Sequence, residues 1–240
     1  MNKFSLLVLG IAIMIGFTRC EKGTVVSEAT ADVFIQSIKN PKDTSFTVYA
    51  AIHSVFSYNL ISSASVVTPE GITLQLTDYE KLGNSFYNAP PDSTYSPIPP
   101  TLGSYTYTVT FKDKEVLSYT NSLSSTFISP PTITSLVQSA DKDTVYMSWK
   151  TVSNADGYQI KITKLDTITK VVTQVRYISP FNDSTTPPKS SLTLGIPISY
   201  FSSSLNSSEK YSLQLDALLF ENTVNSLLQA MGTTSKTIKF

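Results

Sequence analysis

The sequence predicts an all-β protein in which two tandem antiparallel β-sandwiches follow an N-terminal signal segment. Apolar and polar residues alternate with a period of two over much of the chain after residue 30, and helical periodicity is scarce. Ser, Thr, Val, Ile, Tyr and Phe dominate these runs, as is typical of strands with one buried face. Pro130-Pro131 divides the 240 residues into nearly equal parts. We expect a domain boundary there, because a double proline cannot donate to a sheet ladder.

The second half carries the clearer alternation, in three runs at residues 145–150, 158–163 and 211–217. The Asn154–Gly157 segment is a turn signal between the first two runs. Several short strands at this spacing predict a β-sandwich. In the last run we expect the apolar residues to point inward, and Ser212, Gln214 and Asp216 to point toward water.

Four features of residues 130–240 resemble a fibronectin type III domain. Pro131 precedes the first strand, Trp149 lies on the expected second strand, Gly157-Tyr158 opens the third, and Tyr211 begins the alternating run that ends at Ala217. The resemblance implies structural roles for Trp149, Tyr158 and Tyr211, with Trp149 in the core. It also implies that the Tyr211 hydroxyl bonds back to nearby backbone as a tyrosine corner.

The first half, residues 31–129, alternates over residues 46–52 and again, without a fault, over 103–111. A turn at residues 112–114 leads to an expected returning strand at 116–119. The aromatic-threonine run 103–111 resembles the penultimate strand of an immunoglobulin-like domain from a bacterial surface protein. The resemblance implies a second sandwich, and the two halves show no convincing internal repeat.

The N-terminus has the features of a secretory signal. Lys3 precedes an apolar run over residues 4–17, and the only cysteine of the chain, Cys20, follows directly. The run is too short to cross a bilayer as a helix, which needs ~20 apolar residues. We expect residues 1–19 to be the signal peptide and residues 20–30 to be a tether.

Residues 17–20, Phe-Thr-Arg-Cys, resemble the lipobox of bacterial lipoproteins, although the family prefers Leu at position 17 and a small residue at position 19. Cys20-Glu21-Lys22 is similar to the mature start of lipoproteins from Bacteroidota-type bacteria. The resemblance implies that Cys20 carries acyl chains and anchors the protein to the outer membrane of the cell envelope. The alternative is an ordinary signal cleaved near Ala29-Thr30-Ala31, with Cys20 incidental.

The charge and the cysteine content argue against nucleic-acid binding and against an internal disulfide bond. The chain has 18 basic and 18 acidic residues, and no basic block is present to neutralise phosphates, so we expect no nucleic-acid binding. Removal of residues 1–19 would take away two basic residues and no acidic one, which leaves a net charge of −2. A single cysteine cannot form an internal disulfide, so the fold must rest on its apolar core.

Catalytic and metal sites have little support in the sequence. His53 is the only histidine, and its position on the polar side of an expected strand predicts a solvent-facing residue rather than a general base. One histidine and one cysteine cannot supply the usual zinc ligands. The carboxylate pairs Asp78/Glu80 and Asp141/Asp143 stand in turn-like sequence, where Asp bonds to backbone. We therefore expect no enzyme activity, no metal and no cofactor.

Residues 82–100 predict a long loop that contains Phe86, Tyr87, Tyr95 and five prolines. Long structureless loops are uncommon in compact domains and are often functional. The three aromatic residues are therefore candidates for ligand binding, by stacking on sugars or by gripping a protein. The alternative is that they fold back and cover the edge of the sandwich.

Together these observations lead to two functional hypotheses. The first is a non-enzymatic, membrane-anchored lipoprotein that serves as a binding, adhesion or spacer module in the cell envelope, with an unidentified protein or glycan partner. The second is a carbohydrate-binding accessory protein of a glycan-uptake system, which uses Phe86, Tyr87 and Tyr95. Both rest on fold analogy, which does not by itself fix function.

Overall fold

The computed structural model describes residues 27–165, 172–175, 190–197, 209–221 and 224–238. Its regular structure consists of fourteen strands and two short 3₁₀ turns, so the prediction of an all-β sandwich fold is confirmed. No helix among these residues is long and apolar enough to cross a membrane. The expected signal peptide and Cys20 lie outside the described residues.

The first half contains seven strands in the order β1-β2-β5-β4-β3-β6-β7, in which each neighbour is hydrogen-bonded to the next. The strands are β1 (Thr30–Lys39), β2 (Thr47–Phe56), β3 (Ile61–Val67), β4 (Thr73–Asp78), β5 (Ser85–Asn88), β6 (Gly103–Phe111) and β7 (Val116–Leu123). The two 3₁₀ turns are η1 (Tyr79–Lys81) and η2 (Asp92–Thr94). All pairings within this half are antiparallel.

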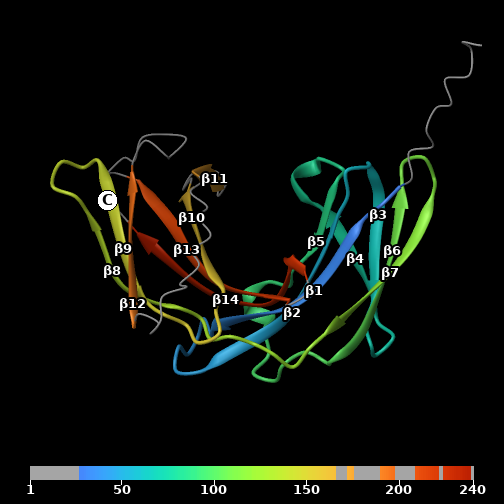
Figure 1. Ribbon diagram of the computed structural model, residues 1–240, viewed down its shortest axis with the longest axis horizontal. Coiled ribbons are helices and arrows are strands. Elements are labelled where there is room, and N and C mark those ends of the chain that lie inside the picture. Colours follow the sequence, from blue (N-terminus) through green and yellow to red (C-terminus); the bar gives the residue numbers. More distant parts are fainter. Residues whose placement is uncertain (1–26, 166–171, 176–189, 198–208, 222–223, 239–240) are drawn as a thin grey trace, which may run out of the picture.

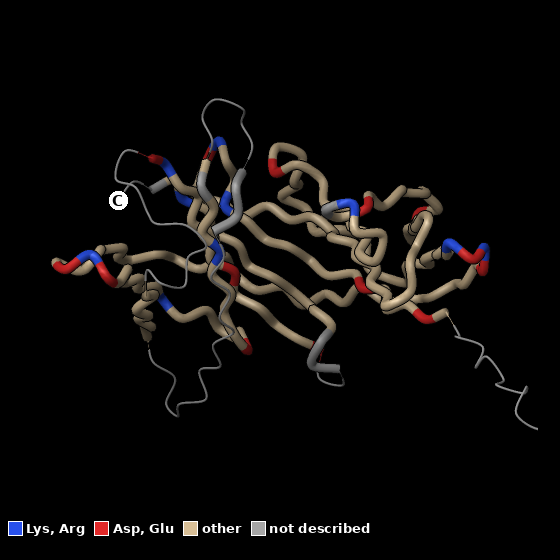
Figure 2. The backbone as a smooth tube through the Cα atoms, turned by 90° about the horizontal axis from the view of Figure 1, so that it is seen from above, with Lys and Arg blue, Asp and Glu red and all other residues tan. Residues whose placement is uncertain are grey.

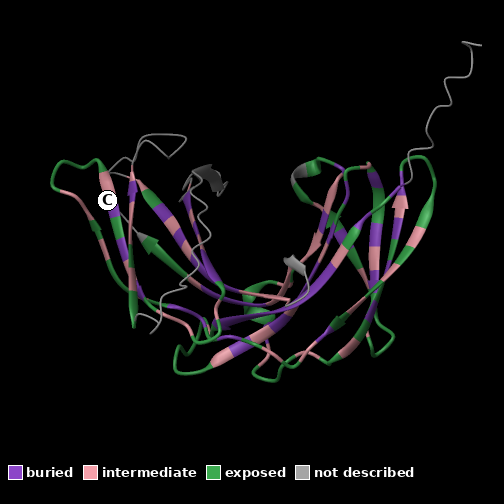
Figure 3. Cartoon of the chain, in the orientation of Figure 1, coloured by how far each residue is buried: buried purple, intermediate pink, exposed green. Residues whose placement is uncertain are grey.

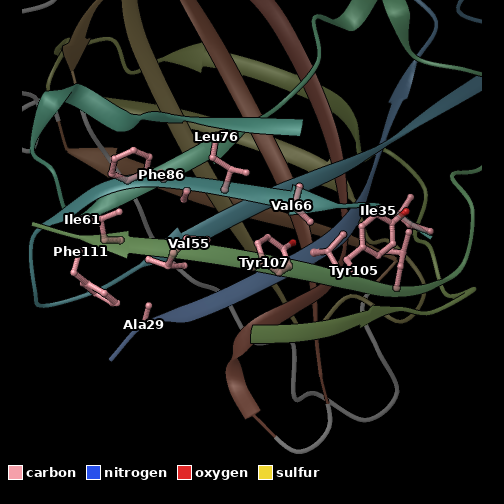
Figure 4. Packing of buried hydrophobic residues seen from close by; sticks show 14 residues of the cluster. Ala29, Ile35, Val55, Ile61, Val66, Leu76, Phe86, Tyr105, Tyr107 and Phe111 are labelled. Atoms are coloured by element: carbon pink, nitrogen blue, oxygen red, sulfur yellow. The ribbon is translucent and has the colours of Figure 1, made fainter. Parts of the chain in front are cut away.

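This sheet rolls back on itself, so that the first strand, β1, and the last strand, β7, lie against each other. Asn121 on β7 donates from Nδ2 to the Ala31 carbonyl on β1 at 3.2 Å, and the Ala29 amide donates to the Tyr119 hydroxyl at 2.9 Å. The apolar cluster enclosed by the roll includes Ile35, Val55 and Phe111 (Figure 4). This cluster is the core of the first half.

The second half forms a four-stranded and a three-stranded layer, ordered β11-β10-β13-β14 and β12-β9-β8. Its strands are β8 (Thr132–Gln138), β9 (Thr144–Lys150), β10 (Gly157–Leu165), β11 (Val172–Val175), β12 (Ser191–Pro197), β13 (Lys210–Glu221) and β14 (Val224–Ile238). Alternate residues of β9, β10 and β13 point into the space between the layers, and Trp149 lies at the centre of this second core. The alternation of the sequence thus identified the inward face of each of these strands.

The two halves are joined by a parallel pairing of their sheets. Strand β14 pairs with β1 from Ile35↔Ala230 to Ile38↔Thr233, which makes one continuous sheet of eleven strands. Gly232 lies in this seam against the connection between the halves, where an added Cβ would be 2.3 Å from the Ser129 carbonyl oxygen. The sheet curves through the molecule, with β8, β9 and β12 outside one wing and β3, β6 and β7 in the other (Figure 1).

A third apolar cluster covers the inner face of the curved sheet at the seam. It combines Phe34 and Ile52 of the first half with Leu218 and Met231 of the second. Buried residues accordingly continue along the central strands from one wing to the other (Figure 3). The central strands are covered on both faces, because their odd and even residues pack into different clusters.

Two local expectations are corrected by the structure. Residues 82–100 are not a structureless loop, since they contain β5, which pairs with both β2 and β4. Residues 27–30 of the expected tether belong to the folded half, where Ser27 and Ala29 are buried and β1 begins at Thr30.

Candidate functional site

A cleft of about 420 Å³ opens beside the seam between the two halves. One wall comes from the end of β1 and the turn that follows it, and the other from β13 and β14, with Asp92 of η2 at the rim. We call this feature the junction cleft. Its lining residues are Gln36, Ile38, Lys39, Asn40, Pro41, Thr44, Asp92, Gln214, Thr233, Thr234 and Ser235.

The turn that forms the first wall is fixed by side-chain caps. The Asn40 carboxamide oxygen accepts the amides of Lys42 at 2.8 Å and Asp43 at 3.1 Å. The Asp43 carboxylate in turn accepts the Ser45 amide at 3.0 Å. These are the local bonds by which Asn and Asp favour turns, and they fix the backbone of the turn that contains Thr44.

The floor of the junction cleft is a chain of hydrogen bonds that runs from one half to the other. The Tyr95 hydroxyl donates to the Gln36 oxygen at 2.6 Å, and the Gln36 amide donates to the Thr233 hydroxyl at 2.8 Å. Thr233 then donates to Asp216 at 2.7 Å, and the Gln214 amide reaches both Asp216 oxygens at 3.0 and 3.1 Å. Because every donor has an acceptor, the floor is held in one arrangement.

Asp216 lies at the end of this chain and is only 3% exposed. Burial raises its pKa, since the charged carboxylate loses water, while the hydrogen bonds from Thr233 and Gln214 and the nearby Lys161 oppose the rise. The expectation that Asp216 points to water is therefore wrong. Its side of β13 is the inner face of the curved sheet, where the first half covers it.

Phe86, Tyr87 and Tyr95 do not form a shared exposed platform. Phe86 is buried in the core of the first half, whereas Tyr95 is buried on the opposite face of the sheet and Tyr87 packs beside it. Burial raises the pKa of Tyr87 to about 12. The prediction that these rings are ligand-binding loop aromatics is corrected, because the segment forms a strand and the rings serve two separate clusters.

The prediction that His53 faces solvent is also wrong. The residue is 2% exposed, because β2 is covered on both faces and the ring packs beside Tyr105, with ring centroids 5.2 Å apart. The Tyr107 hydroxyl donates its one proton to the Asp32 carbonyl at 2.7 Å. His53 Nδ1 lies 3.1 Å from the Tyr107 hydroxyl oxygen. Because the Tyr107 proton is already donated to Asp32, His53 Nδ1 must be the donor in this second bond.

The aromatic residues of the second half occupy its core. Trp149 and Tyr158 are both buried and stack edge to face, with ring centroids 5.4 Å apart. The Tyr158 hydroxyl accepts the Val152 amide at 2.7 Å. The Tyr211 hydroxyl lies 3.3 Å from the Glu209 carboxylate. The Tyr158 hydroxyl thus bonds to backbone, and the tyrosine corner expected of Tyr211 stays a prediction.

The carboxylates of Asp78 and Asp141 accept backbone amides within their own turns. Both Asp78 oxygens accept the Gly83 amide, at 3.0 and 3.1 Å, and Asp141 accepts the Asp143 amide at 3.2 Å. Within the part of the chain that is described, no three metal-ligating side chains gather at one place.

Sequence reasoning missed the residues of the junction cleft, above all Gln36 and Thr233, and it missed the burial of Asp216, which accepts a hydrogen bond from Thr233. The available signal was polar residues within long strands, at positions whose neighbours on the same face are apolar. That signal gains meaning only once β1 and β14 are known to pair.

No protein-family model matches the chain, and a comparison with curated proteins finds no match. The functional argument therefore rests on the geometry of the chain itself.

Proposed function

We propose that this protein is a non-enzymatic, membrane-anchored binding module of the cell envelope, and that the junction cleft is its ligand site. The observation that carries the proposal is the cleft's position at the seam, where both halves supply walls and one hydrogen-bonded floor. Binding sites of 300–1,000 Å³ that are largely preformed are typical for small ligands. A cleft of about 420 Å³ falls in that range.

The lining favours a small polar ligand. Amides from Asn40 and Gln214, hydroxyls from Thr44 and Ser235, and the Asp92 carboxylate surround the space. Such groups donate to and accept from hydroxylated or amide-bearing molecules, of which a saccharide unit is one example. Lys39 and Asp92 bring one charge of each sign, so the cleft has no strong preference for an ion.

The strand order supports the resemblance to a fibronectin type III domain, which remains part of the proposal. Seven strands in a four-plus-three arrangement, with β11-β10-β13-β14 facing β12-β9-β8, follow the order of that architecture. The order β1-β2-β5 and β3-β6-β7 in the first half similarly supports an immunoglobulin-like sandwich. In such sandwiches recognition is commonly carried by loops at the ends.

The anchor part of the proposal rests on the sequence. A charged start, an apolar run over residues 4–17 and Cys20 directly after it favour acylation at Cys20. More than one acyl chain is needed for stable attachment, and the lipoprotein resemblance implies such a set. The buried position of His53, on the sheet face opposite the cleft, supports a role without catalysis.

Titration calorimetry of the purified chain against a panel of mono- and disaccharides and small amides tests the ligand site. We expect one member to bind, and Asp92→Ala and Thr44→Trp to weaken it at least about tenfold, as the loss of one charged hydrogen bond or of the space itself would do. Asp143→Ala is the matched control, because Asp143 is exposed on a distant turn. Binding that survives both cleft variants would overturn the assignment of the site.

A further inference from the structure

One end of the first half exposes a group of large apolar side chains from two neighbouring turns. Tyr58 is 95% exposed, and Phe56 contacts it edge to face with ring centroids 5.1 Å apart. We call the group the anchor-end patch; its members are Phe56, Tyr58, Leu60, Tyr79 and Leu82, all of them exposed. Exposed apolar groups of this kind on a soluble surface commonly mark an interaction site.

The patch is held on a fixed backbone. The Ile61 amide donates to the Gly83 carbonyl at 2.6 Å, and the Ser57 amide donates to the Asn84 carbonyl at 2.9 Å, which ties the two turns together. Asp78 holds the Gly83 amide from the other side. The apolar side chains are therefore presented by an ordered framework and are not produced by fraying.

The described chain begins at this same end. The Glu28 carbonyl accepts the Ser57 hydroxyl, and the Ser27 hydroxyl donates to Asp113 at 3.2 Å on the adjacent β6–β7 turn. Cys20 precedes Ser27 by seven residues, and seven residues span at most about 25 Å. A lipid on Cys20 would hold a bilayer surface within that distance of the patch.

We propose that the anchor-end patch inserts into the interfacial region of the phospholipid bilayer to which the protein is anchored; the proposal rests on the acylation of Cys20 proposed above. Tyr and Phe are well suited to the level of the headgroups, where one end of the ring is apolar and the other wet. Leu60 and Leu82 supply the purely apolar contact beside them.

The charges around the patch indicate what kind of bilayer it fits. Lys81, Lys112 and Lys114 belong to the turns at this end and are exposed. They are balanced by exposed Glu28, Asp113 and Glu115. Basic and acidic positions are interspersed along the chain (Figure 2). Insertion therefore depends on the apolar side chains and not on anionic lipid, and it is insensitive to salt.

The opposite end of the first half provides a matched control. Ile72, Ile98 and Leu102 are also exposed there. Strand β3 begins at Ile61, beside the anchor-end patch, and ends at Val67, just before the turn that contains Ile72. The length of β3 therefore separates the two groups. Seven strand residues extend about 20 Å. This second group lacks aromatic rings and lies far from the start of the described chain.

The orientation that follows places the junction cleft away from the membrane. Strand β1 begins at Thr30 beside the anchor-end patch and ends at Lys39 on the cleft rim. Ten strand residues extend about 30 Å. The patch and the anchor would together fix the tilt of the protein and expose the cleft to ligands above the bilayer.

The first test uses the intact acylated protein in phosphatidylcholine vesicles, with an environment-sensitive dye on a cysteine introduced by Leu82→Cys or, as control, by Ile98→Cys. Acylated Cys20 leaves no other thiol to react. We expect a blue-shifted emission at position 82 that spin-labelled lipid quenches, and water-like emission at position 98. Equal, water-like emission at both positions in protein that floats with the vesicles would overturn the patch proposal.

The second test separates the patch from the lipid. A chain that starts at residue 20 and carries Cys20→Ser is mixed with phosphatidylcholine vesicles, and its flotation is measured at low and high salt. We expect weak, salt-insensitive partitioning that falls about tenfold or more when several patch side chains are replaced by Ser. The patch substitutions are Phe56→Ser, Tyr58→Ser, Leu60→Ser and Leu82→Ser; the control substitutions are Ile72→Ser, Ile98→Ser and Leu102→Ser.

The two proposals fail in different ways. If Cys20 is not acylated, the intact protein partitions only as weakly as the Cys20→Ser chain, and the salt-insensitive partitioning of the second test still reports on the patch. If the patch does not insert, its Ser variant floats as well as the control variant although the acylated protein floats normally. Circular dichroism of each variant verifies that the fold is retained.

Discussion

Two buried titratable groups near β1 are expected to cancel each other in the pH dependence of stability. Burial raises the pKa of Asp32 from 3.8 to about 6, against the hydrogen bonds from the Leu228 amide and from Asn121. Burial lowers the pKa of His53 from 6.5 to about 4. The two groups are linked through Tyr107, which bonds to the Asp32 carbonyl and to the His53 ring.

The signs of the two effects are opposite. Folded Asp32 binds its proton more tightly than the unfolded chain does, so its contribution is most favourable below pH 3.8 and is lost as the pH rises to about 6. Folded His53 binds its proton less tightly, so its contribution is complete above pH 6.5 and is lost as the pH falls to about 4. Each shift exceeds two pH units and corresponds to about 3 kcal/mol.

The test is to measure the free energy of unfolding in urea between pH 4 and pH 7 for the native chain, Asp32→Asn and His53→Asn. The Asn side chain at position 53 can still donate toward Tyr107. We expect little net change from these two groups in the native chain, a rise of about 3 kcal/mol with pH in Asp32→Asn, and a fall of similar size in His53→Asn. Asp216, whose pKa burial also raises, adds the same fall to all three proteins.

The slope of stability against pH is the decisive quantity, because each substitution also shifts the overall level. If all three proteins show one slope, the two groups are not held away from their ordinary pKa values by burial. If only one variant changes, the buried group that it lacks is the one that titrates abnormally.

Three further outcomes follow from the seam. Gly232→Ala is expected to cost more than about 3 kcal/mol in unfolding free energy, because its Cβ would lie 2.3 Å from the Ser129 carbonyl oxygen; a thermal scan that matches the native chain would contradict this. Thr233→Val should cost about 1–3 kcal/mol, because the Gln36 amide loses its acceptor and Asp216 loses one of its donors, while Thr237→Val, on the exposed part of β14, should cost little by the same urea titration. The halves made separately, by cutting between residues 129 and 130, should expose the third apolar cluster and associate or unfold; monomeric, fully stable halves by light scattering and circular dichroism would disprove this.

Alternation and turn signals predicted six of the fourteen described strands, β2, β6, β7, β9, β10 and β13, because one face of each of these strands meets a core. The inward positions of β9, β10 and β13 follow directly from the pattern around Trp149. Alternation was misleading where both faces are covered. The pattern placed His53 on the face of β2 that was expected to meet solvent. That face packs against β6, so His53 is buried as well.

The junction cleft was beyond prediction for a different reason. It depends on the parallel pairing of β1 with β14, whose paired residues are about 195 positions apart in the sequence. Local propensity carries no information about such a pairing. Gln36 and Thr233 each stand as ordinary polar residues in their own strands, and only the seam brings them to 2.8 Å. The positions of Phe86, Tyr87 and Tyr95 could not be predicted for a related reason, because the residues that they pack against lie on strands far away in the sequence.

Strand β1 connects the separate parts of the proposed function. One face, including Ile35, packs into the core of the first half, and the other, including Phe34, packs into the cluster shared by both halves. Its first residue lies beside the anchor-end patch, and its last residue, Lys39, lies on the rim of the cleft. A strand that is hydrogen-bonded on both sides, to β2 and to β14, cannot bend freely. The distance and the angle between the proposed bilayer contact at one end and the proposed ligand site at the other are therefore set by the sheet itself, which is the property that the proposed function requires.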